Sequence, residues 1–171
     1  RRMAVSERRG NHCPEKCGMI SIVVAMDVNQ LIGANHKMPW HCPADLAHFR
    51  QLTLHHHLLM GRVTYEHLPK RLDHRILHVA GHKPLSDSDA LPCSDAEALC
   101  REWKKKEEVL YVCGGAQIYA AAIAYADELW ITRIEQACAG DTWFPAFSPE
   151  EFILLSAEQK EGCNIMHYRR R

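Results

Sequence analysis

The feature that most constrains the fold is a series of short apolar segments, rich in β-branched residues, that alternate with segments of helical character. Short apolar runs bounded by turn residues are typical of buried strands. A strand that is followed by a helix usually returns to its sheet as a parallel neighbour. The alternation therefore predicts parallel strands at residues 19–25, 58–60, 76–80, 109–113 and 129–134.

The segments between these runs predict the helices and loops. Pro43 is suited to the first turn of a helix, and Ser94 followed by Glu97 has the pattern of a capping box. We expect helices over 43–53, 62–68, 95–106 and from Gly114-Gly115 to about 124, a polar loop over 82–92, and a closing hairpin of 152–157 and 164–169. The predicted fold class is α/β: a single domain with a central, mostly parallel twisted sheet, an antiparallel C-terminal edge strand and helices on both faces.

Length and charge limit the function classes. The chain has 171 residues, the size of one ordinary domain, with 21 basic and 21 acidic residues and a formal net charge of zero. A balanced charge argues against an obligate nucleic-acid partner, which normally requires a basic surface. No run of 18 apolar residues occurs, so no membrane partner is expected.

The first 18 residues are polar and lack the apolar centre of a secretory signal. We expect residues 1–18 to be an extension, either a disordered tail or a segment that precedes a start at Met19, and residues 19–171 to form the folded domain. Eight cysteines without an export signal are interpreted as reduced thiols, which predicts a cytoplasmic location.

Asp45 is the first candidate for chemistry. It falls in the first turn of the helix predicted over 43–53, where an acid is common because the helix dipole favours an anion. Phe49, four residues later, shares its face of the helix. A carboxylate on an inward, aromatic face needs a partner, and a ligand with two parallel N–H donors would supply one.

Two glycine turns form the second candidate. Gly114-Gly115 and Gly61-Arg62-Val63-Thr64 each follow a predicted strand and open a helix. Glycine lets the backbone approach a phosphate, and open α/β sheets bind ligands at the carboxyl ends of their strands. Each turn alone is weak evidence, since only part of the dinucleotide fingerprint is present.

The sequence gives weaker evidence for a metal site or a cysteine nucleophile. His12, Cys13 and Cys17 lack a second ligand pair at zinc-finger spacing, and strand alternation would separate the side chains of residues 55–57. Cys42 lies beside His41 without a recognisable oxyanion arrangement. We therefore predict no metal and no cysteine nucleophile.

Taken together, the residues resemble those of the dihydrofolate reductase family over residues 19 to about 170. The resemblance is carried, in order, by the segments MISIVVAMDVNQLIG, MPWHCPADLAHF, LLMGRVTYEHL, VLYVCGGAQIY, ELWITRIE and GDTWFP. It implies NADPH-dependent reduction of 7,8-dihydrofolate to tetrahydrofolate by a monomer. Hydride would pass to C6 and a proton to N5 of the substrate, in support of one-carbon and thymidylate metabolism.

The resemblance also implies roles for individual residues. Asp45 would hold the pterin ring and support protonation of N5, with Thr132 bonded to Asp45, Trp40 ordering water and Met38 closing over the site. The remaining substrate residues would be Val23, Leu46, Phe49, Leu68, Leu72, Arg75 and Cys113, of which Arg75 would bind the glutamate carboxylate. The cofactor residues would be Ala25, Ile32, Gly33, Gly61, Arg62, Val63, Thr64, Gly81, His82, Cys113, Gly114, Gly115, Ala116, Gln117, Ile118, Tyr119 and Thr142.

Two departures from the family pattern concern the cofactor. Gly81-His82 stands where relatives often have Ser or Thr followed by a polar or basic residue, so Arg62 and His82 are the groups expected at the 2′-phosphate. Ala116 replaces a third glycine, and because alanine is small we expect no loss there.

Two other functions were weighed against this one. A pyrimidine reductase of riboflavin synthesis shares the fold and the glycine turns but would not need Asp45, Phe49 and Arg75 together. A non-catalytic folate- or NADPH-binding protein would not need to retain Asp45, Trp40 and Thr132. All five residues are present, which favours the dihydrofolate enzyme.

Overall fold

The computed structural model describes residues 18–82, 85 and 90–171. The predicted extension, apart from Gly18, and the group of His12, Cys13 and Cys17 lie outside the described residues. No helix in the described part of the chain has the length and apolar character needed to cross a membrane.

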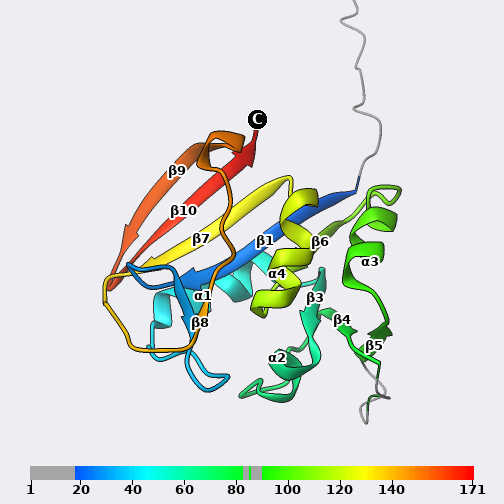
Figure 1. Ribbon diagram of the computed structural model, residues 1–171, viewed down its shortest axis with the longest axis horizontal. Helices are drawn as coiled ribbons and strands as arrows, with labels where there is room; N and C mark the ends of the chain where they lie inside the picture. The colour runs from blue at the N-terminus through cyan, green and yellow to red at the C-terminus, as the bar shows by residue number, and fades with distance from the viewer. Residues whose placement is uncertain (1–17, 83–84, 86–89) are drawn as a thin grey trace, which may run out of the picture.

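A large sheet forms the centre of the molecule (Figure 1). Its strands are β1 (Met19–Met26), β3 (His57–Gly61), β4 (Ile76–Ala80), β5 (Ala90–Cys93), β6 (Val109–Val112), β7 (Glu128–Ile134), β9 (Phe152–Lys160) and β10 (Cys163–Arg170). Their order is β5-β4-β3-β6-β1-β7-β10-β9. Neighbours from β5 to β7 are parallel, whereas β10 is antiparallel to β7 and to β9. The predicted sheet is confirmed, with the closing hairpin as its edge and β9 outermost.

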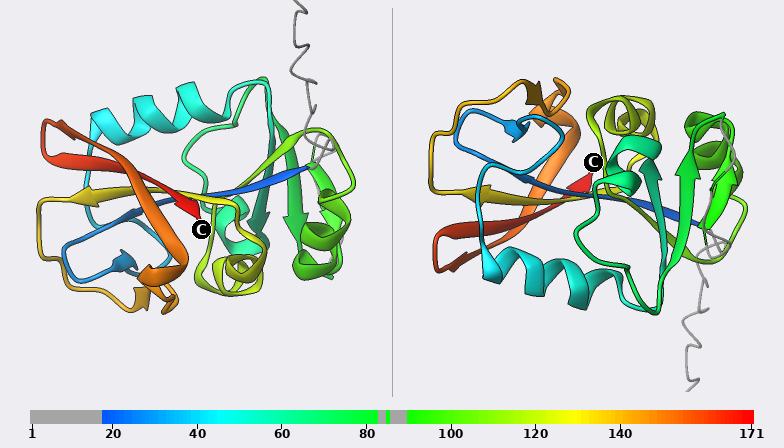
Figure 2. Two further views of the ribbon diagram at one scale, coloured as in Figure 1. Left: turned by 90° about the horizontal axis from the view of Figure 1, so that it is seen from above. Right: turned by 90° about the horizontal axis from the view of Figure 1, so that it is seen from below.

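Helices cover both faces of this sheet, as predicted. Figure 2 shows α1 (Pro43–Thr53) on one face and α3 (Ala96–Trp103) with α4 (Ala116–Ala122) on the other. The short helix α2 (Arg62–Glu66) follows β3 directly, and the 3₁₀ turns η1 (Ile123–Tyr125) and η2 (Pro149–Glu151) precede β7 and β9.

Successive side chains of β1 point to opposite faces of the sheet, so this one strand contributes residues to two hydrophobic clusters. Ile20 and Ile22 pack with Trp103 of α3 on one face. Val23 points the other way and belongs to the cluster against which Phe49 of α1 packs. Because both faces are covered by helices, β1 carries apolar side chains on both sides, as its sequence predicted.

Two local predictions were wrong, and one element was not predicted. The cap of α3 is Asp95, whose side chain accepts a hydrogen bond from the Ala98 N–H, so Ser94 and Glu97 form no capping box. The predicted polar loop ends in strand β5, which pairs with β4 and ends the order of strands, and an edge strand tolerates a residue such as Pro92. The ribbon of β2 (Leu31–Gly33) and β8 (Thr142–Trp143) was not predicted, because its strands are too short to show alternation.

Candidate active site

Asp45 is a buried carboxylate at the centre of the candidate site. It lies in the first turn of α1 and is only 9% exposed. Burial raises its pKa above the ordinary value, while a hydrogen bond from the Thr132 hydroxyl and the charge of His48 act in the opposite direction. Thr132, on β7 opposite Ala25 of β1, is 2% exposed. An acid whose pKa lies nearer to neutrality is suited to proton transfer.

Trp40 and Met38 differ in exposure although they are two residues apart. Trp40 is 9% exposed and packs in a small cluster with Ile134 and Ile165, whereas Met38 is 51% exposed. The Trp40 Nε1–H has no acceptor among the described residues. Since buried donors are normally satisfied, this N–H is available to a ligand or an ordered water.

Val23 lies within β1, Cys113 directly follows β6, and Tyr119 lies near both of them. The Tyr119 hydroxyl donates a 2.8 Å hydrogen bond to the Val23 carbonyl oxygen from the opposite face of the sheet. Burial raises the pKa of Tyr119 well above its ordinary value, and the nearby Cys113 and Asp45 raise it further. Tyr119 therefore contacts the β1 backbone at Val23 and lies near Cys113 and Asp45, in addition to packing against Gly114.

The apolar wall of the site leads from α1 to Arg75. Phe49, Leu68 and Leu72 pack against one cluster of buried residues, while Leu46 on α1 is 47% exposed. Leu68, Leu72 and Arg75 also line a cavity of about 490 Å³. A second hollow of about 330 Å³, between α1 and the β9–β10 hairpin, is lined by none of the predicted site residues.

Arg75 is held firmly in this wall. Its side chain is 3% exposed, its Nε donates to the Asp73 carbonyl oxygen at 2.9 Å, and its guanidinium reaches the Asp73 carboxylate at 3.2 Å. The guanidinium also lies 5.9 Å from the centre of the Phe49 ring. A rigid fork of N–H donors fixed next to an aromatic ring is suited to a planar carboxylate.

The two glycine turns lie side by side because β3 and β6 are neighbours in the sheet. The Gly61 N–H donates to the Gly114 carbonyl oxygen at 2.8 Å, and a cis peptide bond joins Gly114 to Gly115. Gly114 has φ of +113°, and a Cβ there would lie 3.3 Å from the Tyr119 hydroxyl oxygen. A Cβ on Gly115 would lie 3.5 Å from the Thr64 side-chain oxygen, so the turns form one backbone surface.

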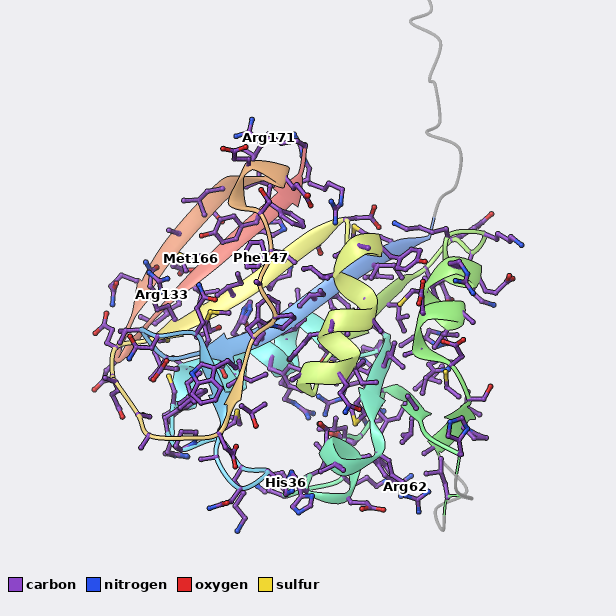
Figure 3. The ribbon with its side chains drawn as sticks, in the orientation of Figure 1. His36, Arg62, Arg133, Phe147, Met166 and Arg171 are labelled. Carbon is purple, nitrogen blue, oxygen red and sulfur yellow. The ribbon has the colours of Figure 1, made fainter. Side chains whose placement is uncertain are left out.

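The remaining residues predicted at the phosphates surround this surface. Arg62 pairs with Glu66 at 2.7 Å and packs over Gly81, while His82 is exposed beside it. Figure 3 places Arg62 and His36 along the same edge of the molecule. Val63 and Gln117 are exposed, Ala116 and Ile118 are half-buried, and a Cβ on Gly61 would meet Ile118 at 3.2 Å.

A loop stabilised by Asp27 carries the other predicted cofactor residues. Burial would raise the pKa of Asp27, but the backbone N–H groups of Cys138, Leu31 and Asn29 lower it below its ordinary value. This anchor holds strand β2, with Ile32 and Gly33, against β8, where Gly33 pairs with Thr142. Ala25 lies on β1, two residues before Asp27.

Comparison with known proteins identifies the family. A model of the dihydrofolate reductase family matches residues 19–170. The chain belongs to the dihydrofolate reductase family. Dihydrofolate reductases of Bacillus subtilis and Haemophilus influenzae are 38% and 32% identical over 143 and 148 residues, which cover 82% and 86% of this chain and 84% and 92% of theirs.

A solved dihydrofolate reductase structure has the same fold. The enzyme from Enterococcus faecalis, complexed with NADP(H) and RAB-propyl, matches with a TM-score of 0.81 at 27% identity, covering 90% of this chain and 96% of that one. Members of the dihydrofolate reductase family are NADPH-dependent oxidoreductases, so the fold, family and reaction class predicted from sequence are confirmed.

One structural residue and one contact of the site were not predicted from sequence. The residue is Asp27, which has a signal in the sequence, since an Asp directly after a strand and two residues before Asn29 is a common turn signal. The Tyr119 contact with Val23 has no sequence signal, because it joins residues 96 positions apart. Within the described residues, no group of three or more His, Cys, Asp or Glu side chains is placed to hold a metal.

Proposed function

We propose that this chain reduces 7,8-dihydrofolate to 5,6,7,8-tetrahydrofolate with NADPH. The observation that carries the proposal is Asp45: a buried acid with a raised pKa, bonded to Thr132 and placed near Tyr119. Such an acid both accepts hydrogen bonds from the pterin N3–H and 2-amino group and supports protonation at N5.

The other substrate residues position the ligand. The Val23 and Cys113 carbonyl oxygens lie at the pterin edge, Phe49 packs on the ring, and Leu46, Leu68 and Leu72 contact the benzoyl group. Arg75 binds the glutamate carboxylate. The Trp40 Nε1–H orders water next to Asp45, and Met38 covers the site and excludes bulk water, which strengthens the hydrogen bonds inside.

The two glycine turns would hold the cofactor phosphates, because Gly61 and Gly114 are joined by a backbone hydrogen bond at the carboxyl ends of the neighbouring strands β3 and β6. NADPH supplies the hydride for C6 when bound. Ala25, Ile32 and Gly33 would face the nicotinamide, with Thr142 supporting that loop, and Arg62, Gly81 and His82 would recognise the 2′-phosphate. The residues that would hold the phosphates are Gly61, Arg62, Val63, Thr64, Cys113, Gly114, Gly115, Ala116, Gln117, Ile118 and Tyr119.

Residues 19–171 form the reductase domain of this proposal, acting as a cytoplasmic monomer without an obligate nucleic-acid partner. The zero net charge supports the last point. Size-exclusion chromatography with light scattering measures the oligomeric state; a stable dimer would contradict the monomer.

The decisive assay is the fall in absorbance at 340 nm when purified protein is mixed with NADPH and dihydrofolate. We expect oxidation of NADPH that depends on dihydrofolate, and slower oxidation of NADH. A pyrimidine substrate of riboflavin synthesis serves as the matched alternative. Turnover of that pyrimidine without turnover of dihydrofolate would replace the proposed function.

A further inference from the structure

Two histidines on neighbouring strands contact each other on the face of the sheet that α3 covers. His57 begins β3, and His78 is the central residue of β4. Ile76 pairs with His57 and lies two residues before His78, so both histidine side chains point to the same face of the sheet. The His57 Nδ1 lies 3.0 Å from the His78 Nε2, and the rings are stacked with their centres 5.2 Å apart. The two rings therefore share one hydrogen bond between β3 and β4.

Trp103 and Glu108 hold the pair in place. Trp103, the last residue of α3, is 1% exposed, and its ring centre lies 4.9 Å from that of His57 and 5.5 Å from that of His78, both in edge-to-face contact. The Glu108 carboxylate lies 2.8 Å from the His57 Nε2, and the Glu108 carbonyl oxygen accepts a hydrogen bond from the Trp103 Nε1–H at 2.8 Å. The histidine pair thus joins β3, β4, the end of α3 and the residue that leads into β6.

These contacts determine where protons sit on the two rings. An ionised carboxylate only accepts hydrogen bonds, so the His57 Nε2 next to Glu108 carries a proton. In the neutral pair, the His57 Nδ1 accepts and the His78 Nε2–H donates. One added proton is tolerated, because His57 then donates from both nitrogens while His78 accepts at Nε2 and holds its proton at Nδ1. A second added proton puts a hydrogen on both facing nitrogens, which removes the hydrogen bond and brings two positive charges together.

The surroundings of the pair also oppose the second proton. Lys106, just after α3, has its Nζ 5.4 Å from the centre of the Trp103 ring and adds a positive charge. Burial lowers the pKa of His78, and the charges of His57 and Lys106 lower it further, to about 4. The pair therefore gains its first proton more readily than its second.

Among the residues that the structure describes, the other titratable side chains on the surrounding elements are neutral or paired elsewhere. Burial raises the pKa of the thiols of Cys100 on α3 and Cys93 on β5, so both stay neutral in acid. The charged side chains of α3 and of the residue after it have these partners: Glu97 with Arg101, Glu102 with Lys105 and Lys104 with Asp127. The balance of charge at the pair is thus set by Glu108 and Lys106.

We propose that His57 and His78 form a pH-sensitive switch, which fastens α3 to β3 and β4 while the pair is neutral or singly protonated and releases α3 when both rings are protonated. Imidazole is the side chain that ordinarily gains its charge in mild acid. Because the pKa of His78 in the folded state lies below the ordinary value of about 6.5, the stabilising contribution of neutral His78 is fully present above about pH 6.5 and is lost as the pH falls toward 4. The inference goes beyond the proposed function, and its test uses no turnover.

The first measurement locates the protons directly, by nitrogen-15 NMR of the imidazole rings of the full chain between about pH 8 and pH 4. At the upper end, both rings should be protonated at Nε2 alone. The first proton on the pair should appear on His57, and His78 should become fully charged only in a separate step near pH 4. Simultaneous charging of both rings in one step near pH 6.5 would overturn the proposal.

The second measurement compares unfolding by urea at pH 7 and pH 4.5 in the wild type and in His78→Gln. Glutamine can keep a hydrogen bond to His57 but does not take up a proton. We expect the equilibrium constant for unfolding to rise on acidification by at least about 10-fold more in the wild type than in the variant. All other titrating groups are common to both proteins, so the difference isolates His78. Amide hydrogen exchange at pH 4.5 should also be faster in α3 of the wild type than in α3 of the variant.

Two further variants complete the design. His78→Phe keeps an aromatic ring against Trp103 and should lose the acid sensitivity in the same way, which covers a failure of His78→Gln to fold. His56→Gln is the matched control, because His56 lies on the same strand as His57 but points to the opposite face, where its ring lies 5.5 Å from that of Tyr111. It should keep the acid dependence of the wild type. Equal acid dependence in the wild type and the His78 variants, or an equal loss of it in His56→Gln, would overturn the proposal.

Discussion

Asp45 and Gly114 mark two sides of one candidate site, and they contribute to it differently. On the substrate side, Asp45, Thr132 and Arg75 act through buried polar side chains. On the cofactor side, Gly61 and Gly114 contribute backbone that packs closely against Ile118 and Tyr119. We therefore expect substitutions on the substrate side to alter the reaction rate and its pH dependence. Substitutions on the cofactor side should alter NADPH binding and the stability of the fold.

The largest effect is expected for Asp45→Asn. The variant should fold and bind NADPH but lose dihydrofolate turnover by about 10²–10⁴-fold at pH 7, because its amide cannot supply the proton. The rate should recover partly at lower pH, where the substrate is already protonated in part. Steady-state kinetics over a pH series measures this, and equal turnover of variant and wild type at pH 7 would remove Asp45 from the mechanism.

Arg75→Ala tests whether substrate binding also depends on a buried side chain. Loss of a charged hydrogen-bonding partner costs about 1.5–3 kcal/mol, which corresponds to about a 10- to 100-fold higher KM for dihydrofolate, with a smaller change in kcat. Arg50→Ala is the control, because Arg50 also pairs with Asp73 but its side chain is 52% exposed. If KM stays unchanged in Arg75→Ala, Arg75 is not a substrate ligand.

Gly114→Ala tests the cofactor side, to which Gly114 contributes its backbone. The residue has φ of +113°, and the new methyl group would press on Tyr119, so we expect a loss of about 1–3 kcal/mol in stability and weaker NADPH binding. Gly162→Ala is the control: its φ is +77°, but a Cβ there meets nothing within 4 Å. Thermal unfolding and cofactor titration measure both variants. Normal NADPH affinity in Gly114→Ala would contradict the proposed cofactor surface.

Tyr119→Phe addresses the contact that joins the two sides. Removing the hydroxyl frees the Val23 carbonyl oxygen and costs about 0.5–1.5 kcal/mol in stability. We expect a kcat only a few-fold lower, measured at saturating dihydrofolate and NADPH. A loss as large as that of Asp45→Asn would mean that Tyr119 takes part in proton transfer.

The smallest expected effect is on the way the stability of the fold depends on pH. Because burial raises the pKa of Asp45 in the folded state, its contribution to stability is fully present below the unfolded pKa and is lost as pH rises through the folded value. Asp45→Asn should therefore melt at a higher temperature than wild type at pH 7. The difference should disappear below about pH 4, near the ordinary Asp pKa. A lower melting temperature at pH 7 would show that ionised Asp45 stabilises the fold.

Local patterns in the sequence determined the strands, the glycine turns and the inward position of one carboxylate. The apolar β-branched runs predicted the parallel strands, since strands covered on both faces need apolar residues throughout. Gly114-Gly115 and the segment from Gly61 indicated the turns that a ligand can approach. Asp45 and Phe49, four residues apart in a helix, indicated a carboxylate on an inward face.

Only the tertiary structure decided which distant groups meet. The Thr132 bond to Asp45 and the Tyr119 bond to the Val23 carbonyl oxygen join residues from separate elements. The β2–β8 ribbon and its Asp27 anchor also depend on partners far away in the chain. Helix and strand periodicity reports which face of its own element a side chain occupies, but the partner on that face is fixed by sheet order and packing.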